Sequence, residues 1–250
     1  EQGTVEFKDV SFRYPHASED ELSNISFKIE KGQTLAIIGA TGSGKTTLIS
    51  LIPRFYDATE GEVLVDGVNV KNYKFDTLYD KLGYVTQKAV LFAGSIRENV
   101  FFGESAAPET DEELKNAIEL SQAEEFVNKL PDGTEHMISQ MGRNVSGGQK
   151  QRLSIARALS RKPEILVFDD SFSALDYKTD AKLREGLNEK LKDTTKIIVA
   201  QRISTIRHAD KIIVLDRGEA VGMGTHEELM KNCDVYKEIA LSQLSAAELA

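Results

Sequence analysis

The chain has 250 residues, of which 40% are hydrophobic and 28% charged, so it can form one large α/β domain or two small ones and shows no sign of disorder. Its formal net charge of -9 disfavours a nucleic-acid partner, because such partners require a basic surface. The single cysteine, Cys233, excludes an internal disulfide, and no apolar run approaches the roughly 20 residues that span a bilayer.

Alternating patterns at the start of the chain predict strands. Residues 4–14 alternate apolar and polar side chains with a slip at Lys8 and Asp9, which predicts a strand with a bulge. Residues 24–29 and 62–67 read as further strands, each followed by a turn. Four short apolar runs, TLAII, EILVF, KIIVA and KIIVL, are typical of strands buried on both faces of a parallel sheet.

Helical patterns fill the intervals between these strands. Over residues 89–144 the buried-strand pattern disappears and helical patterns dominate, which indicates a helical subdomain inserted into an α/β core. The predicted helices cover residues 46–52, 112–130, 148–160 and 179–192.

A glycine-rich loop follows the run TLAII. Its sequence, GATGSGKTT, has the G-x-x-x-x-G-K-[ST] pattern between a strand and a helix, the context that this pattern requires. The glycines let successive N–H groups converge on phosphate oxygens, and the helix N-terminus adds its positive dipole end. We expect Lys45 to reach the β- and γ-phosphates and the Thr46 hydroxyl to bind Mg²⁺. The loop therefore predicts a nucleoside triphosphate site formed by Gly39, Thr41, Gly42, Ser43, Gly44, Lys45, Thr46 and Thr47.

Asp169 ends the buried run ILVF, where a carboxylate is costly unless it has a partner. A Mg²⁺ ion, reached directly or through water, supplies such a partner. An acid at a strand end means little alone, but following a phosphate loop it predicts a metal contact.

The segment VSGGQKQRLSIARAL, residues 145–159, resembles the signature of ATP-binding cassette (ABC) ATPases, usually written LSGGQ, with Val145 in the leucine position. The resemblance covers essentially the whole chain, with the motifs in the family's order. It implies an α/β fold: a P-loop NTPase core with a parallel sheet flanked by helices, an N-terminal antiparallel β-subdomain and an inserted helical subdomain. Residues 52–67 and 91–103 resemble the exporter branch.

The resemblance implies roles for further residues. Tyr14 matches the aromatic that stacks on adenine, with an ordinary strand aromatic as the alternative. Gln87 matches the glutamine that contacts Mg²⁺ and the attacking water, with a solvated loop glutamine as the alternative. Asp176 ends SALD, the loop that crosses the dimer interface. The signature residues expected to contact ATP on a second domain are Ser146, Gly147, Gly148 and Gln149, and the implied metal contacts are Thr46, Gln87 and Asp169.

Two positions depart from the family pattern at the same phosphate. Members that hydrolyse ATP well carry a glutamate base where this chain has Asp170. Aspartate is one methylene shorter, and a displacement of about 1 Å can cost on the order of 10²-fold in rate. Gln201 replaces the switch histidine and can donate a hydrogen bond but carry no proton. The implied catalytic set is thus Asp170, Gln201 and Gln87. Residues 136–144 also lack a glutamate of the family's coupling segment.

The resemblance implies an ATP-binding and hydrolysing domain of an exporter, with ATP and Mg²⁺ as ligands. Its own site is expected to be degenerate, which means that it holds ATP and hydrolyses it slowly. Its signature is expected to complete the site of a second, non-identical ABC ATPase domain. The transmembrane domain of the transporter is the other expected partner, at the cytoplasmic face of the cell membrane, and no nucleic acid is expected.

The whole chain, residues 1–250, is expected to be one ABC ATPase domain. We divide it into a β-subdomain with a RecA-like core (1–88 and 159–232), a helical subdomain with the signature (89–158) and a C-terminal helical tail (233–250). Because the sequence begins at Glu1 without an initiating methionine, we expect a domain of a longer protein.

Two other functions stay open. One is a catalytically competent homodimeric exporter ATPase in which Asp170 is a slower base. The other is a soluble ABC-type protein that uses ATP as a conformational clamp in translation or repair, which the exporter-like segments and the acidic net charge disfavour.

Overall fold

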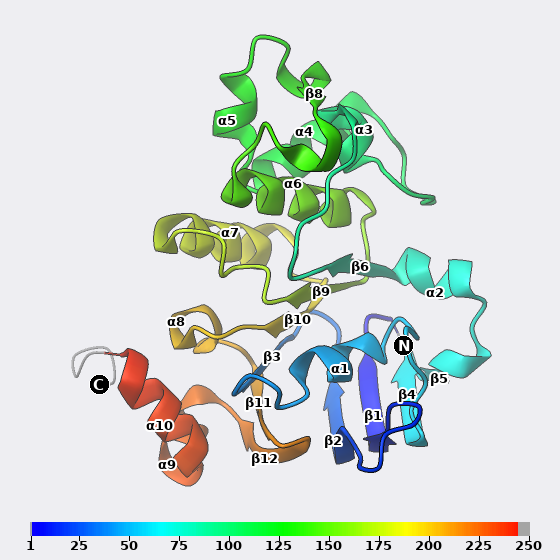
Figure 1. The fold of residues 1–250 in the computed structure, drawn as a ribbon, viewed down its shortest axis with the longest axis vertical. Coiled ribbons are helices and arrows are strands. Elements are labelled where there is room, and N and C mark those ends of the chain that lie inside the picture. The colour runs from blue at the N-terminus through cyan, green and yellow to red at the C-terminus, as the bar shows by residue number, and fades with distance from the viewer. Residues whose placement is uncertain (1, 245–250) are drawn as a thin grey trace.

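The computed structural model describes residues 2–244, and a six-stranded sheet organises them (Figure 1). The strand order is β12-β11-β3-β10-β9-β6. All neighbours pair in parallel except β12, which pairs with β11 in the antiparallel sense at one edge. The strands are β3 (Thr34–Gly39), β6 (Leu82–Val85), β9 (Ile165–Asp169), β10 (Thr195–Val199), β11 (Lys211–Asp216) and β12 (Glu219–Gly224).

A second sheet is antiparallel, with the order β2-β1-β4-β5. The bulge predicted at Lys8 and Asp9 is confirmed, because the pairing register of β1 with β2 shifts between Phe7 and Val10 and Asp9 has a φ of 48°. The strands are β1 (Val5–Phe12), β2 (Leu22–Ile29), β4 (Glu60–Val65) and β5 (Val68–Asn69).

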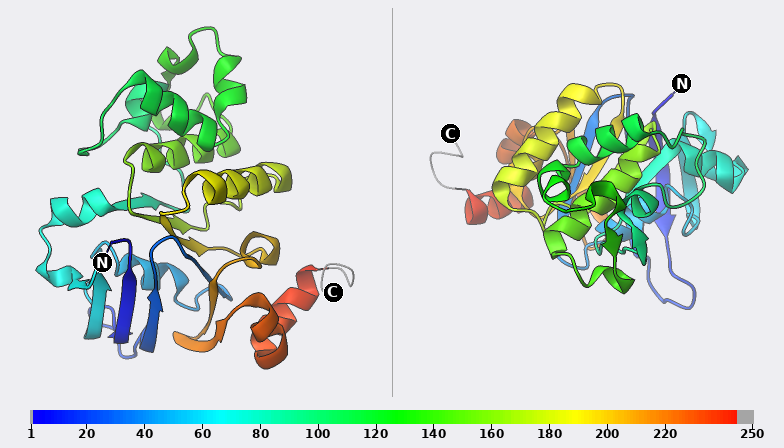
Figure 2. Two further views of the ribbon diagram at one scale, coloured as in Figure 1. Left: turned by 180° about the vertical axis from the view of Figure 1, so that it is seen from behind. Right: turned by 90° about the horizontal axis from the view of Figure 1, so that it is seen from above.

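Helices α3 to α6 gather at the end of the molecule opposite β1, β2 and β4 (Figures 1 and 2). A short strand pair, β7 (Gly94–Ser95) and β8 (Met137–Ile138), lies within this part. The fold class expected from the sequence is confirmed. The helices are α1 (Lys45–Ser50), α2 (Phe75–Lys81), α3 (Ile96–Val100), α4 (Asp111–Leu120), α5 (Glu124–Asn128), α6 (Gly147–Ser160), α7 (Tyr177–Lys190), α8 (Ile203–Ile206), α9 (His226–Asn232) and α10 (Asp234–Gln243).

The prediction of one continuous helix over residues 112–130 was wrong, because the structure has two helices there, α4 and α5. Gln122, between them, adopts a left-handed backbone with a φ of 63°, which interrupts the helical hydrogen bonds. Its freed carbonyl accepts a hydrogen bond from Arg152 Nη1 at 3.0 Å. The break between α4 and α5 thus coincides with a long-range contact to α6.

Successive side chains of the parallel strands point to opposite faces of the sheet and pack in two separate hydrophobic cores. Leu35 and Ile37 of β3 pack in a core with α1 and the antiparallel sheet. Ala36 and Ile38 pack in the other core, with side chains from α3 to α10. Each fully buried aliphatic side chain contributes about 1.5–3 kcal/mol, so strands buried on both faces join the antiparallel sheet and α1 on one side to helices α3 to α10 on the other.

The carboxyl ends of four neighbouring strands meet at one edge of the sheet. Val199 at the end of β10 lies opposite Asp169 on β9 and Ile37 on β3, and Val85 at the end of β6 lies opposite Phe168. The loops that follow these strands therefore converge there, as is usual for ligand sites in open α/β sheets.

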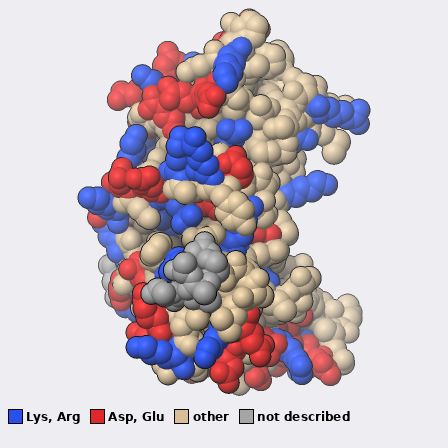
Figure 3. All heavy atoms as spheres, turned by 90° about the vertical axis from the view of Figure 1, so that its left-hand side faces the viewer, with Lys and Arg blue, Asp and Glu red and all other residues tan. Residues whose placement is uncertain are grey.

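Three further features concern membrane-spanning helices, the surface charge and the C-terminal tail. No helix within residues 2–244 is both long enough and apolar enough to cross a membrane. On the face drawn in Figure 3, basic and acidic side chains are interspersed. The predicted C-terminal tail contains α10, and its residues 245–250 lie outside the described part of the chain.

Candidate nucleotide site

A cavity of about 200 Å³ lies at the carboxyl edge of the main sheet. Typical small-molecule sites measure about 300–1,000 Å³, so this cavity matches the phosphate end of a nucleotide better than a whole nucleotide. It brings together most of the residues that the sequence predicts. Its lining consists of Glu21, Thr41, Gly42, Gly44, Lys45, Thr46, Thr47, Gln87, Asp169, Asp170, Val199 and Gln201.

The phosphate loop has the conformation that an anion site needs. Gly42 and Gly44 have φ values of 80° and 104°, in the left-handed region that favours glycine. A Cβ atom on Gly42 would meet nothing within 4 Å, so the loop backbone there faces open space. Helix α1 begins after Gly44 without a side-chain cap, and the Ser43 Oγ is buried without a hydrogen-bond partner in the described residues. These free donors fit a phosphate group.

Lys45 turns its ammonium group into its own loop. The Nζ donates to Gly39 O at 2.6 Å and to Ala40 O at 3.0 Å. Burial lowers the pKa of Lys45, and the charges of Asp170 and Asp169 oppose that shift. A phosphate oxygen near this loop would compete with the two carbonyl groups for the same donor.

Thr46 and Asp169 lie within hydrogen-bond distance. Thr46 Oγ1 donates to Asp169 Oδ1 at 3.2 Å. Burial raises the pKa of Asp169 above its ordinary value, and the neighbouring Asp170 adds to this shift. Among residues 2–244, no group of three or more His, Cys, Asp and Glu side chains could hold a metal ion. A Mg²⁺ ion at Thr46 and Asp169 would therefore take its other ligands from phosphate oxygens, water and the amide oxygen of Gln87, which lines the same cavity.

One carboxylate oxygen of Asp170 accepts hydrogen bonds from both predicted glutamines. Gln87 Nε2 lies 3.3 Å and Gln201 Nε2 lies 3.1 Å from Asp170 Oδ2. Burial raises the pKa of Asp170, and the positive charge of Lys45 opposes this shift most strongly. Asp170 also has a left-handed φ of 50°, which Asp adopts more readily than most residues. The three residues implied to be catalytic thus meet at one atom.

Tyr14 lies beside the cavity rather than in its lining. Its hydroxyl is 2.6 Å from Thr47 Oγ1. The ring makes edge contacts with Phe12 and Tyr56, at centroid distances of 4.8 and 5.2 Å. These contacts fix the orientation of the ring, and stacking on adenine stays a prediction.

The signature residues and Asp176 are not brought to this cavity. The exposed Ser146 caps α6, because its hydroxyl accepts from Gln149 N at 3.2 Å and Gln149 Oε1 accepts from Ser146 N at 3.0 Å. Asp176 is exposed and caps α7 by accepting from Thr179 N at 2.8 Å. Their contact with a nucleotide on a second domain stays a prediction.

Comparisons with known proteins decide the family. Residues 22–173 match the ABC transporter family model. This chain belongs to the ABC transporter family. The chain is 42% identical to YgaD of Bacillus subtilis (strain 168), a protein named for multidrug export as an ATP-binding/permease protein, over 95% of this chain. It is 46% identical, over 98% of its length, to an ABC transporter ATP-binding protein of Mycobacterium tuberculosis (strain ATCC 25618 / H37Rv).

A solved structure agrees with this assignment. A bacterial Atm1-family ABC exporter with ATP bound superposes with a TM-score of 0.90 and 34% identity over 96% of this chain. The chain spans 41% and 42% of the two curated relatives and 42% of that solved chain. The exporter features of the sequence are thus shared with relatives that are more than twice as long.

The ABC domain's cavity also contains two residues that the motifs did not indicate. Glu21 and Val199 line it. Val199 ends β10 directly before Ala200 and Gln201, so its place follows from the sheet register. Glu21 comes from the loop before β2. Its carbonyl oxygen packs closely on Gly218, so that a Cβ atom added to Gly218 would lie 2.1 Å from this oxygen. Only tertiary packing places Glu21 at the site.

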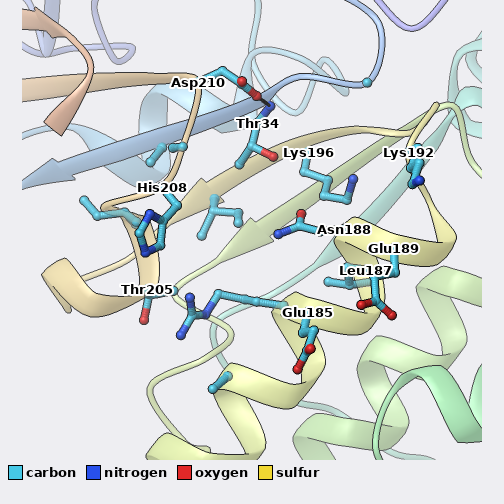
Figure 4. A pocket seen from close by; sticks show the side chains of 17 residues that line it. Thr34, Glu185, Leu187, Asn188, Glu189, Lys192, Lys196, Thr205, His208 and Asp210 are labelled. Carbon is cyan, nitrogen blue, oxygen red and sulfur yellow. Dashed lines mark hydrogen bonds between the residues drawn. The ribbon is translucent and has the colours of Figure 1, made fainter.

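A larger cavity of about 560 Å³ lies near the opposite ends of β3 and β10 (Figure 4). Thr34 and Lys196, at the start of these strands, line it together with residues of α7. Its buried Lys196 already donates to Leu191 O at 2.8 Å and Thr194 O at 3.0 Å, and Arg184 donates to Asp180 Oδ1 at 2.7 Å. Because Lys196 and Arg184 have protein partners and no phosphate loop lines this larger cavity, the smaller cavity is the better candidate for a nucleotide site.

The raised pKa of Asp170 gives a pH-dependent prediction for the nucleotide-free protein. The pKa of Asp170 in the folded protein lies above its unfolded value of 3.8. The protein therefore loses stability as the pH rises from the unfolded pKa through the folded pKa, because the buried group becomes charged. We therefore expect Asp170→Asn to raise Tm at pH 7, and the gain to disappear as the pH approaches 4. Thermal melts at several pH values measure this difference.

Asp176→Asn is the matched control with the opposite sign. Hydrogen bonds from Thr179 lower the pKa of Asp176, so its charge stabilises the fold above the unfolded pKa. This variant should melt lower than the unmodified protein at pH 7 and equally at low pH. A lower Tm for Asp170→Asn at pH 7 would contradict the electrostatic account of the site.

Proposed function

We propose that this chain is the ATP-binding domain of an ABC exporter, and that its own site holds ATP with Mg²⁺ but hydrolyses it slowly. The observation that carries the proposal is the double hydrogen bond at Asp170 Oδ2, which Gln87 and Gln201 share. The expected general base is thus a short carboxylate held by two amides. Gln201 stands where a group able to carry a proton is expected from the family pattern.

Binding follows from the phosphate loop. The N–H groups of Gly42 and residues 44–46 and the Ser43 hydroxyl would face the phosphates, and Lys45 would exchange Gly39 O for a phosphate oxygen. Thr46 and Asp169 would hold Mg²⁺. The ion, when bound, supplies charge neutralisation at the phosphates. Tyr14 would support the adenine beside Thr47.

Hydrolysis requires a base that takes a proton from the attacking water. Asp170 can accept that proton, but its carboxylate is one methylene shorter than a glutamate and is already bound to two amides. A displacement of about 1 Å from the productive position costs on the order of 10²-fold. The amide of Gln201 can hold a phosphate oxygen by one N–H, but it cannot carry charge to it.

The exposed signature is proposed to serve a second ABC ATPase domain. Ser146 and the following glycines open a helix of fourteen residues, α6, at the surface, where N–H groups and a hydroxyl can meet a phosphate. A non-identical partner with its own catalytic glutamate would then hydrolyse ATP against this signature. Asp176 would lie at the same interface.

The transmembrane partner is proposed to dock in a groove beside Gln87. This groove has a volume of about 760 Å³, and Phe55, Tyr79 and Tyr84 line it together with Arg161. Phe55 is 54% exposed, and exposed aromatic side chains in a groove mark a binding surface. Tyr84 belongs to β6, the strand that precedes Gln87, so a bound segment would lie one loop from Asp170. This arrangement would place the domain at the cytoplasmic face of the membrane.

The decisive variant restores both expected groups, Asp170→Glu and Gln201→His. We expect the unmodified protein to bind ATP-Mg²⁺ and to turn over on the order of 10²-fold more slowly than this double variant, because the variant has a longer base and a protonatable switch residue. Steady-state ATP hydrolysis and nucleotide binding measure the two properties separately.

Other outcomes select other functions. Equal turnover of both proteins would make Asp170 a competent base and favour a homodimeric exporter ATPase. Tight ATP binding without turnover in either protein, and without any membrane partner, would favour an ATP clamp. No nucleotide binding would refute the proposal.

The signature has a separate test in the assembled transporter. Ser146→Ala removes the signature hydroxyl, so we expect hydrolysis at the partner's site to fall by about tenfold or more, since an interaction with the nucleotide is lost. The helix-cap loss itself costs about 1 kcal/mol. Thr110→Ala removes the equivalent cap of α4 and serves as the control. Equal activity of the two variants would argue against a signature contact.

A further inference from the structure

The side chain of Gln243 holds the backbone of the segment that carries Gln201. Gln243 Nε2 donates to Gln201 O at 2.7 Å, and Gln243 Oε1 accepts from Ile203 N at 2.9 Å. Both ends of one amide are therefore used, on two backbone groups that lie two residues apart. A primary amide in this orientation satisfies a carbonyl and an N–H at once, because it carries both a donor and an acceptor.

Gln243 belongs to α10, a helix that is packed into the core. Gln243 is its last residue. Tyr236, in the same helix, is fully buried, and its hydroxyl lies 2.6 Å from His226 Nδ1 of α9. Ala240 is also fully buried in the core on that face of the main sheet. Core packing therefore anchors helix α10, and the exposed Gln243 side chain is held by its two hydrogen bonds to residues 201 and 203. Figure 1 shows α10 beside α8 and α9 at this side of the molecule.

Within the described residues, the start of the held segment has no side-chain cap from its own N-cap residue. Helix α8 begins after Arg202, which makes no side-chain cap, so the first N–H group of the helix finds its acceptor in Gln243. Arg202 turns away instead, and its Nη2 donates to Ser173 O and Leu175 O, both at 3.0 Å. Gln243 thus supplies a cap for α8 from a residue 40 positions further along the chain.

The same segment reaches the nucleotide cavity through its first residue. Gln201 Nε2 lies 3.1 Å from Asp170 Oδ2, and the carbonyl of the same residue is the acceptor for Gln243. A fixed carbonyl restricts the backbone from which the Gln201 side chain projects. Through Arg202, the segment is also tied to the SALD loop.

We propose that Gln243 is a positioning residue for Gln201, so that the C-terminal helix sets the distance between Gln201 and Asp170. The inference deepens the proposed function, because it adds a regulatory connection from α10 to the same site. A change that shifts α10 would release residues 201–203 and alter ATP turnover without touching a nucleotide contact.

The first test needs no ATP. In the complete purified protein, we would record the side-chain amide resonances of glutamine by NMR and assign Gln201 from the signal lost in Gln201→Ala. Gln243→Ala should shift the Gln201 side-chain signal, because the orienting carbonyl contact is lost. Gln243→Glu keeps the acceptor for Ile203 N but removes the donor to Gln201 O, so it should shift the same signal too. Ser242→Ala is the control, since among residues 2–244 the Ser242 hydroxyl donates its hydrogen bond within its own helix, to Ile239 O.

The second test is a double-mutant cycle on ATP turnover. We expect Gln243→Ala to change kcat by about threefold or more while KM for ATP stays within about twofold, because a displaced side chain alters a step after binding. In the Gln201→Ala background, Gln243→Ala should have no further effect, since the two residues act as one unit. A merely structural role would give additive effects in both backgrounds.

The outcomes separate this inference from the proposed function. An unmoved Gln201 signal in Gln243→Ala, or additive kinetic effects, overturns the positioning role even if ATP is bound and hydrolysed as proposed. Absence of ATP binding refutes the proposed function, while the NMR comparison still decides whether α10 positions Gln201. A shifted signal together with non-additive kinetics supports the inference.

Discussion

Two adjacent carboxylates, Asp169 and Asp170, are buried at the end of β9, and the arrangement of the site depends on how their charge is balanced. Burial raises the pKa of both groups, so each negative charge costs stability in the nucleotide-free protein. The partners present are the Lys45 ammonium, the Thr46 hydroxyl and amide donors. A divalent cation would be a further partner for the two carboxylates, which is the physical argument for the proposed Mg²⁺ site.

The motif residues of this chain lie in two separate places, the nucleotide cavity and the exposed signature. The phosphate loop, the acid pair and the two glutamines meet in one cavity, whereas the signature lies at the exposed N-terminus of the largely buried helix α6. In the proposed asymmetric exporter, this division has a consequence. Changes at Asp170 and Gln201 weaken only the chain's own site, while the signature can still serve a partner.

Much of the fold could be predicted from sequence because the signals are local. The apolar runs gave the parallel strands, and the loop between TLAII and its helix gave the phosphate site. The break at Gln122 was not predicted, since the residue that binds its carbonyl, Arg152, lies 30 positions away in sequence. Likewise, the motifs indicated Gln87 and Gln201 separately, but their meeting at one oxygen of Asp170 follows from the order of β6, β9 and β10 in the sheet. Glu21 and Gln243 carry no motif, and tertiary packing alone places them.

The central claim is that this site retains ATP rather than consuming it. The most direct measurement is a single-turnover experiment in which the protein is loaded with labelled ATP and Mg²⁺, freed from unbound nucleotide and sampled over time for bound ATP and ADP. The account predicts that the label at this chain's site stays mostly ATP until it dissociates. Conversion of the bound label to ADP before release would contradict it, because Asp170 would then be an effective base despite its two amide contacts.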